Sequence, residues 1–199
     1  MAVRLAVLAS GGGTNLQAII DHFAKRGGAG APHVVVVAAN RAGAGALDRA
    51  RSAAIPTEVI DADDDGASLI DLLRRYSVDL VVLAGYMKKI PASVIAAYHR
   101  RMINIHPGLL PDFGGAGMYG QRVHAAVLAA GVGTTGVTAH FVDDQYDHGP
   151  VIAQWRVAVA DGDTAESLGA RVLEVEHLLY PRVVEMVAAL NDRQFFADF

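Results

Sequence analysis

Short runs of consecutive apolar residues recur along the chain, with room for a helix between each run and the next. Residues 5–9, 34–39 and 80–84 are examples, and they are rich in Val, Leu and Ala. A strand that is apolar at consecutive positions has both faces buried, as in a parallel sheet that helices cover on both sides. The sequence therefore predicts an α/β fold: a doubly wound, mostly parallel sheet with helices on both faces, a variant of the Rossmann fold.

The expected elements alternate regularly up to residue 106, after which the pattern changes. We expect strands at residues 3–9, 34–39, 57–60, 80–84, 102–105, 136–142 and 151–157. We expect helices at residues 14–25, 45–53, 68–76, after Pro91, at 123–130 and from about 163 to Asn191. Asp163 would cap the last helix, with Glu166 three positions later. The last two strands form a C-terminal mixed-sheet extension, reached through the long loop "PGLLPDFGGAGMYG".

All 199 residues are expected to form one domain, because 52% hydrophobic and 19% charged residues suffice for a substantial core. The formal net charge of -4 argues against binding to nucleic acid or to an anionic membrane. The absence of cysteine excludes disulfides, thiolate nucleophiles and sulfur-based metal sites. The apolar runs are far shorter than the ~20 residues that span a bilayer, so we expect a soluble cytoplasmic protein.

Three unusual stretches lie at the ends of expected strands: "SGGGTN" after residues 3–9, "GYMKKI" after 80–84 and "NIHPG" at the end of 102–105. In doubly wound sheets, ligands bind beyond the carboxyl ends of the strands. The three stretches are therefore expected to share one cleft.

The first stretch places three glycines between a strand and a helix that begins near Thr14. Glycines let the backbone approach a ligand closely, and free N–H groups at a helix start favour an anion. No Gly-Lys-Ser/Thr follows, as a nucleoside triphosphate loop would need. Leu16 and Asn40 stand where a dinucleotide site would have its third glycine and its ribose-binding acid. A single phosphate group is the favoured ligand, and a tight turn that binds nothing is the alternative.

Side chains alternate along a strand, so Asn104 and His106 point to the same side. Together they suit hydrogen bonding to a developing oxyanion, or proton transfer near neutral pH. The loop "DDQYDHG" supplies Asp143, Asp144 and Asp147. A carboxylate brought near His106 would raise the pKa of the imidazole and keep it protonated. The alternative for Asn104 and His106 is a satisfied polar pair at a strand end. For Asp143, a solvated acidic turn is the favoured interpretation.

The remaining histidines and Glu176 allow further interpretations. His140, on the strand before that loop, is either a donor that faces the ligand or an edge residue. A metal site built from His106, His140, His148 and Asp147 is disfavoured, because no tight ligand spacing is present, and we expect no metal. Glu176 is expected at the polar edge of a core-facing helical seam. Surface or helix positions are expected for His22, His33, His99 and His124.

Five stretches, in this order and spacing, resemble the glycinamide ribonucleotide formyltransferases, folate-dependent enzymes of purine synthesis. They are "VLASGGGTNLQAII", "VDLVVLAGYMKKI", "INIHPGLLPDF", "GVTAHFVDDQYDHGPVIAQ" and "EVEHLLYP". The resemblance covers nearly the whole chain, and the five stretches together are highly specific. It implies direct transfer of a formyl group from 10-formyltetrahydrofolate to the free amine of glycinamide ribonucleotide, without a covalent enzyme intermediate.

The resemblance also implies roles for individual residues. The catalytic residues would be Asn104, His106 and Asp147: Asn104 and a protonated His106 would stabilise the oxyanion, and Asp147 would keep His106 charged. The ribonucleotide phosphate would bind at Gly13, Thr14 and Asn15, and Glu176 would bind the ribose. The implied folate site comprises Leu83, Met87, Lys88, Lys89, Ile90, Asn104, Val142 and Asp144.

The resemblance further implies one formyltransferase domain with two parts, a phosphate-binding half at residues 1–100 and a catalytic and folate-binding half at 101–199. The expected partners are the two small-molecule substrates, with no nucleic acid and no membrane. A homodimer is implied by the resemblance only.

Three features depart from the family pattern. The stretch "DADDDGAS" lacks the Arg that contacts folate in many members, and Lys88 or Lys89 is the expected substitute. The segment between His106 and His140 is several residues longer than usual, and His148 stands where a small residue is commoner. Two other functions stay open: a formyltetrahydrofolate deformylase, against which the phosphate loop counts, and a non-catalytic sugar-phosphate or folate-binding module, against which the triad counts.

Overall fold

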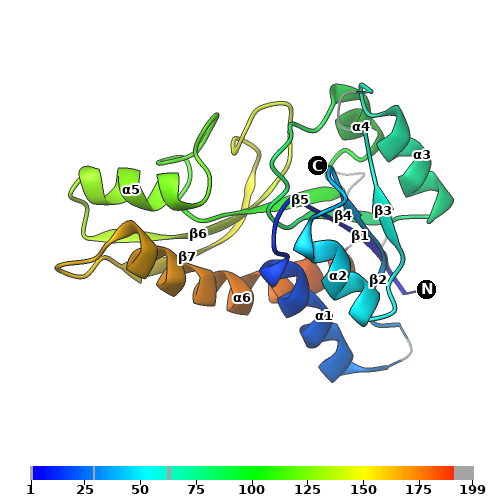
Figure 1. Ribbon diagram of the computed structural model, residues 1–199, viewed down its shortest axis with the longest axis horizontal. Helices are drawn as coiled ribbons and strands as arrows, with labels where there is room; N and C mark the ends of the chain where they lie inside the picture. Colours follow the sequence, from blue (N-terminus) through cyan, green and yellow to red (C-terminus); the bar gives the residue numbers. More distant parts are fainter. Residues whose placement is uncertain (1, 29, 62–63, 191–199) are drawn as a thin grey trace.

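The computed structural model describes residues 2–28, 30–61 and 64–190, and its frame is a seven-stranded sheet in the order β3-β2-β1-β4-β5-β6-β7 (Figure 1). The strands are β1 (Arg4–Ala9), β2 (His33–Ala39), β3 (Thr57–Val59), β4 (Leu80–Leu83), β5 (Met102–His106), β6 (Thr134–Phe141) and β7 (Val151–Ala158). The helices are α1 (Thr14–Arg26), α2 (Gly45–Ser52), α3 (Ala67–Arg75), α4 (Ala92–Ala97), α5 (Gln121–Ala129) and α6 (Ala165–Leu190). Asn191, the expected end of the last helix, lies outside the described residues. None of the described helices is both long and apolar enough to cross a bilayer.

Strands β1 to β5 are parallel, while β6 and β7 are antiparallel to their neighbours, so the predicted α/β class and mixed extension are confirmed. Strand β1 shows why its apolar run predicted this fold. Its alternate side chains enter two cores on opposite faces of the sheet. Leu5 and Val7 pack with α1, α2 and α6, whereas Ala6 and Leu8 pack with α3 and α4.

Helix α6 is fixed by Tyr180 against the carboxyl end of β4 and the neighbouring strand β5. This side chain is fully buried, and its hydroxyl lies 2.7 Å from the carbonyl oxygen of Leu83 and 3.2 Å from that of Ile103. Burial, with the nearby Glu176, raises the pKa of Tyr180 well above its usual value, so the hydroxyl remains a donor. Because Glu176 lies one turn earlier on α6, this contact places its carboxyl beside the strand ends.

The start of α6 differs from the prediction by one residue. Thr164, not Asp163, caps the helix: its Oγ1 accepts the N–H of Ser167 at 3.1 Å, and the Oγ of Ser167 accepts the N–H of Thr164 at 2.9 Å. Asp163 instead pairs with Arg171 at 2.6 Å, and Glu166 is not part of the cap. The reciprocal geometry is that of a capping box, displaced by one position from the expected one.

Strand β6 contains a glycine that packing requires. A Cβ atom at Gly136 would lie 2.1 Å from the carbonyl oxygen of Trp155 and 2.6 Å from Cδ2 of Leu109, whereas one at Gly133 would have no neighbour within 4 Å. We expect Gly136→Ala to lower the free energy of unfolding by about 3 kcal/mol, and Gly133→Ala to change it by less than about 0.5 kcal/mol. Urea denaturation measures both values. Equal stability of the two variants would contradict the packing of β6.

Candidate active site

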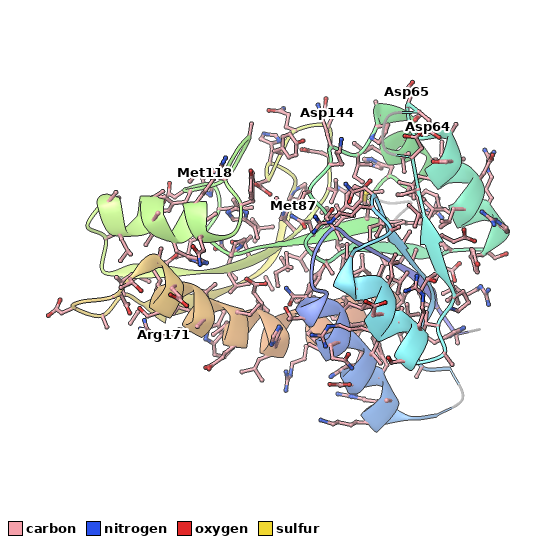
Figure 2. All side chains as sticks on the ribbon, viewed as in Figure 1. Asp64, Asp65, Met87, Met118, Asp144 and Arg171 are labelled. Atoms are coloured by element: carbon pink, nitrogen blue, oxygen red, sulfur yellow. The ribbon has the colours of Figure 1, made fainter. Side chains whose placement is uncertain are left out.

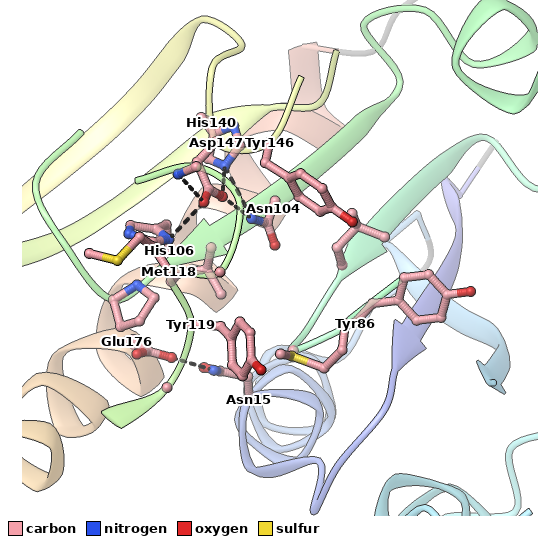
Figure 3. Close-up of a pocket in the computed structure, with 18 of the residues that line it drawn as sticks. Asn15, Tyr86, Asn104, His106, Met118, Tyr119, His140, Tyr146, Asp147 and Glu176 are labelled. Atoms are coloured by element: carbon pink, nitrogen blue, oxygen red, sulfur yellow. Dashed lines mark hydrogen bonds and ion pairs between the residues drawn. The ribbon is translucent and has the colours of Figure 1, made fainter. Parts of the chain in front are cut away.

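A cavity of about 640 Å³ lies beyond the carboxyl ends of β4 and β5 and reaches the start of α1 (Figure 3). Its walls come from the β4–α4 connection, the end of β5, the loop before α5, the loop after β6, and α6. Asn15, segment 85–90 and segment 104–107 all contribute to the lining. The prediction that the three stretches share one cleft is therefore confirmed.

Asn104 and His140 face each other across the antiparallel β5–β6 pair at one end of this cavity. The Nδ2 of Asn104 lies 3.1 Å from Nε2 of His140 and 3.5 Å from Oδ1 of Asp147. The Nδ1 of His140 lies 2.8 Å from the carbonyl oxygen of Phe141, so this nitrogen carries a proton. The other nitrogen accepts from Asn104 when the ring is neutral. His140 is thus a partner of Asn104 rather than an edge residue.

Asp147 joins these residues to His106, as Figure 3 shows. Its Oδ2 lies 3.4 Å from Nδ1 of His106 and accepts the N–H of Gly115 at 3.0 Å. Burial alone would raise the pKa of Asp147, but His140, His106 and the Gly115 N–H together lower it. The carboxylate is therefore ionised at neutral pH. Its backbone has a φ of 55°, in the left-handed region, which holds the side chain toward the other three groups.

His106 is 3% exposed, and each of its ring nitrogens faces an acceptor. The Nδ1 faces Asp147, and the Nε2 lies 2.9 Å from the carbonyl oxygen of Phe113. Burial nevertheless lowers the pKa of His106 below its ordinary value, because desolvation outweighs the opposing effects of Asp147 and Phe113. Asp147 thus raises the pKa of His106, as predicted, but the net shift is downward and disfavours the protonated ring. If the neutral ring of His106 gains a second proton, both ring nitrogens become hydrogen-bond donors.

The loop that carries Asp147 is closed by an ion pair. The Nδ1 of His148 lies 2.7 Å from Oδ2 of Asp143, and the other carboxylate oxygen of Asp143 accepts the N–H of Gln145 at 2.9 Å. The hydrogen bond with Asp143 raises the pKa of His148. The side chain of Asp143 is 31% exposed, as a solvated acidic turn requires, and it also lines the cavity. His148, unusual for the family pattern, fastens the loop at the position after Asp147.

Asn15 and Glu176 meet at the opposite end of the cavity. The Nδ2 of Asn15 donates to Oε2 of Glu176 at 2.5 Å, and the Oδ1 of Asn15 is buried without a partner among the described residues. Glu176 is 7% exposed, and burial raises its pKa to about 7, although Asn15 partly opposes this. Gly13 and Thr14 precede Asn15 at the start of α1 and do not line the cavity itself.

Ser10 connects the glycine loop to segment 85–90. Its N–H donates to the carbonyl oxygen of Gly85 at 3.0 Å, and its Oγ accepts the N–H of Met87 at 2.9 Å. The serine is 5% exposed, so both hydrogen bonds are shielded from water. The two loops are consequently held at a fixed separation.

Most residues of the implied folate site lie together. Those that line the cavity are Leu83, Met87, Lys88, Lys89, Ile90, Asn104 and Val142. Asp144 lies instead in an adjoining depression of about 400 Å³, which it shares with Asp65 and Lys89. Figure 2 shows Asp144 and Asp65 on the same side of the molecule. Lys89 lines both hollows and thus connects them.

The sequence patterns missed several lining residues. His124 was expected at a surface or helix position; it lies on α5 but is 5% exposed and lines the cavity. Burial and the nearby His106 lower its pKa. The buried Val127, three positions later on the same helix, was the available signal for an inward face. Tyr119 and Tyr146 are also in the wall, half-exposed. Within the described residues, no group of three or more acidic or histidine side chains is arranged to hold a metal ion.

The sequence profile of the family described as formyl transferase matches residues 3–184. The chain belongs to the formyl transferase family. A chloroplastic phosphoribosylglycinamide formyltransferase of Vigna unguiculata is 47% identical over 188 residues, which cover 92% of this chain and 60% of the plant protein. The chain thus spans less than two thirds of that relative. The phosphoribosylglycinamide formyltransferase of Bacillus subtilis is 34% identical over 196 residues, which cover 96% of this chain and 97% of the relative.

Solved structures of the formyl transferase family have the same fold. Glycinamide ribonucleotide transformylase 1 of Geobacillus kaustophilus superposes with a TM-score of 0.85 at 39% identity, covering 94% of this chain and 100% of the other. A formyltetrahydrofolate deformylase of Pseudomonas syringae gives a TM-score of 0.84 at 24% identity, covering 95% of this chain and 62% of the other. At that identity, the second likeness shows the fold alone.

The buried carboxyl of Glu176 makes the stability of this formyl transferase depend on pH. The folded protein holds this proton up to about pH 7, whereas the unfolded chain releases it near pH 4.5. Raising the pH through this window therefore favours unfolding, by roughly 3 kcal/mol in all. We expect Glu176→Gln to be more stable than the native protein at pH 8, with a difference that shrinks toward pH 4.5. Thermal unfolding at several pH values checks this, with the exposed Glu174→Gln as control; identical pH profiles would contradict the raised pKa.

Proposed function

We propose that this protein transfers the formyl group of 10-formyltetrahydrofolate to the amine of glycinamide ribonucleotide, a step of de novo purine biosynthesis. The observation that carries the proposal is the convergence of Asn104, His106 and Asp147 at one end of a cavity whose other end holds Asn15 and Glu176. The Bacillus subtilis relative, which the chain spans almost completely, carries the name of this activity. The proposed domain is residues 1–199, with a phosphate-binding half at 1–100 and a catalytic and folate-binding half at 101–199.

The ribonucleotide is assigned to the Asn15 end. The N-cap of α1 is Gly13, with φ 75° and no side-chain cap, and no acidic residue stands in the first turn. Free N–H groups at such a helix start suit a phosphate, so Gly13, Thr14 and Asn15 are the proposed phosphate contacts. Glu176, which Tyr180 and Asn15 position, is the proposed acceptor for the ribose hydroxyls.

The folate co-substrate is assigned to the wall formed by segment 83–90 and Val142. Leu83 and Ile90 are buried there, and Met87 is 44% exposed, which leaves apolar surface for an aromatic ring system. Asp144 borders the adjoining depression. Lys88 and Lys89 lie on the same wall, and Lys89 is the proposed partner for the acidic tail because it faces both hollows.

The proposed reaction proceeds through a tetrahedral intermediate. The neutral amine attacks the formyl carbon, a C–N bond forms, and the carbonyl electron pair moves to oxygen as an oxyanion. The Nδ2–H of Asn104 donates to this oxyanion, and a nearby positive charge on His106 stabilises it further. Collapse of the intermediate breaks the bond to N10 of the folate and releases tetrahydrofolate and the formylated product.

His106 is the proposed proton carrier. It begins neutral, because burial lowers its pKa, and it gains a proton as the attacking nitrogen loses one. The Nε2, which does not face Asp147, is the nitrogen assigned to exchange this proton through a water, and the exchange requires its 2.9 Å contact with the Phe113 carbonyl to open for that step. Asp147 and the Phe113 carbonyl then each accept a hydrogen bond from the charged ring. The proton finally passes to N10, which leaves as a neutral amine.

The proposed partners are these two small molecules, and the resemblance supports a homodimer. The net charge of -4 and the short apolar runs support a cytoplasmic protein that binds neither nucleic acid nor a membrane. Sedimentation of the purified protein tests the oligomeric state.

The function is tested by following 10-formyltetrahydrofolate consumption with and without glycinamide ribonucleotide. The proposal expects consumption only when the ribonucleotide is present, together with a formylated ribonucleotide. Release of formate in its absence would instead make the protein a deformylase, and no consumption in either case would make it a binding module.

A further inference from the structure

The glycine loop is held to the segment around the start of α2 through three consecutive carbonyl groups. Each carbonyl accepts one hydrogen bond from segment 41–49. The three pairs are Arg41 Nε–H to Ser10 at 2.7 Å, Ala46 N–H to Gly11 at 3.1 Å, and Arg49 Nε–H to Gly12 at 2.7 Å. Two of the three donors are guanidinium groups.

This arrangement fixes the direction of the N–H groups of the same peptides. In a trans peptide the N–H points opposite to the carbonyl, so carbonyls bound to segment 41–49 turn the N–H groups of Gly11, Gly12 and Gly13 away from it. No acceptor among the described residues receives these three N–H groups. The loop therefore presents a row of unused donors on the side away from α2, next to the start of α1.

Arg49 hydrogen-bonds to the peptide between Gly12 and Gly13, whose N–H is a proposed phosphate contact. The Gly12 carbonyl, which Arg49 binds, belongs to the same peptide as the Gly13 N–H. A hydrogen bond from a cation to a carbonyl polarises the peptide and strengthens its N–H as a donor. The same guanidinium also reaches α1, because its Nη1 lies 3.3 Å from Oε1 of Gln17.

The charge of Arg49 is not neutralised by a neighbouring carboxylate. Its hydrogen-bond partners are the neutral Gly12 carbonyl and Gln17 amide, and the described residues offer it no ion pair. Arg51, two positions later on the same helix, pairs instead with Asp48 at 2.7 Å. The close fit at Gly13, where a Cβ would lie 2.6 Å from Cα of Ala46, keeps segment 41–49 against the loop.

We propose that Arg49 is a positioning residue for a phosphate monoester, orienting and polarising the Gly12–Gly13 peptide from behind the glycine loop. This inference rests on the proposed phosphate contacts at Gly13, Thr14 and Asn15. The buried, unpartnered Oδ1 of Asn15 is an acceptor, so it independently supports a ligand that brings a donor, such as a ribose hydroxyl, next to the phosphate position. Arg41 binds the Ser10 carbonyl and has the same role two peptides before the Gly12–Gly13 peptide.

The test is binding of ribose 5-phosphate, measured by titration calorimetry on the full chain without any folate. Arg49→Met should raise the Kd for ribose 5-phosphate about tenfold, while Arg51→Met, on the same helix, should leave it within twofold. In the formyl-transfer assay, Arg49→Met should raise KM for the ribonucleotide by a similar factor, with kcat and the KM for 10-formyltetrahydrofolate within twofold. If the substitution only disturbed the structure, it would change kcat and both KM values.

Native affinity for ribose 5-phosphate in a folded Arg49→Met variant would overturn the inference. If that variant does not fold, Arg49→Lys and Arg49→Gln replace it: the cationic variant should bind more tightly than the neutral one, and equal affinity would overturn the inference. Failure of the native protein to bind ribose 5-phosphate would remove the phosphate site and the inference with it. Binding without formyl transfer would reject the proposed reaction and leave the role of Arg49 standing.

Discussion

His106→Ala is expected to lower kcat about a thousandfold while the Kd for glycinamide ribonucleotide stays within a few-fold of the native value. The substitution removes the group that takes up a proton during the reaction and leaves Asn104 as the donor to the oxyanion. The ribonucleotide contacts lie at the other end of the cavity, around Asn15 and Glu176, so binding is retained. Single-turnover kinetics, with calorimetry for binding, separate the two effects.

The control for this variant is the exposed His99→Ala, which should keep native kcat. Because His106 is buried, thermal unfolding must first show that His106→Ala is folded. Near-native turnover in a folded His106→Ala protein would exclude a catalytic role for this side chain.

Asp147→Asn should reduce kcat by about three orders of magnitude, with little change in fold. The side chain keeps its size, but the ionised carboxylate that faces His106, His140 and Asn104 becomes a neutral amide. The amide replaces one acceptor oxygen by an NH2 group with two donors, facing groups that need an acceptor, and it no longer stabilises the charged form of His106.

The pH dependence of this variant distinguishes a loss of charge from a loss of shape. Removing the carboxylate lowers the pKa of His106 further. The pH midpoint of the remaining activity should therefore lie below the pH midpoint of native activity. The exposed Asp71→Asn, on α3, is the matched control and should leave kcat unchanged. A loss of activity smaller than tenfold would show that Asp147 only positions the loop.

The fold could be predicted because runs of apolar residues in the sequence show which strands are buried on both faces. Strand β1, apolar at five consecutive positions, cannot belong to a sheet with one wet face, and the structure places its side chains in two cores. The cap of α6 was harder, because Asp163 and Thr164 are both good capping residues. The choice between them depends on Arg171, two turns into the helix, which engages Asp163. A local pattern does not contain that contact.

The candidate site was predictable in its parts but not in its electrostatics. Strand alternation placed Asn104 and His106 on one side, and both now face Asp147. The charge on His106 depends on how completely the loop around Phe113 and Gly115 covers it, which is a tertiary property. His124 was missed for the same reason, since its burial results from packing against Gly169, where an added Cβ would lie 2.9 Å from its ring.

Ser10 has a consequence for the design of inhibitors. One buried serine hydrogen-bonds to the loop assigned to folate, and its own carbonyl is held at the start of the glycine loop assigned to phosphate. The two recognition surfaces thus form a rigid template with a constant spacing. A single compound that joins a phosphate mimic to a folate mimic by a linker of matching length would engage both at once, and its affinity would gain from the high effective concentration of the second group.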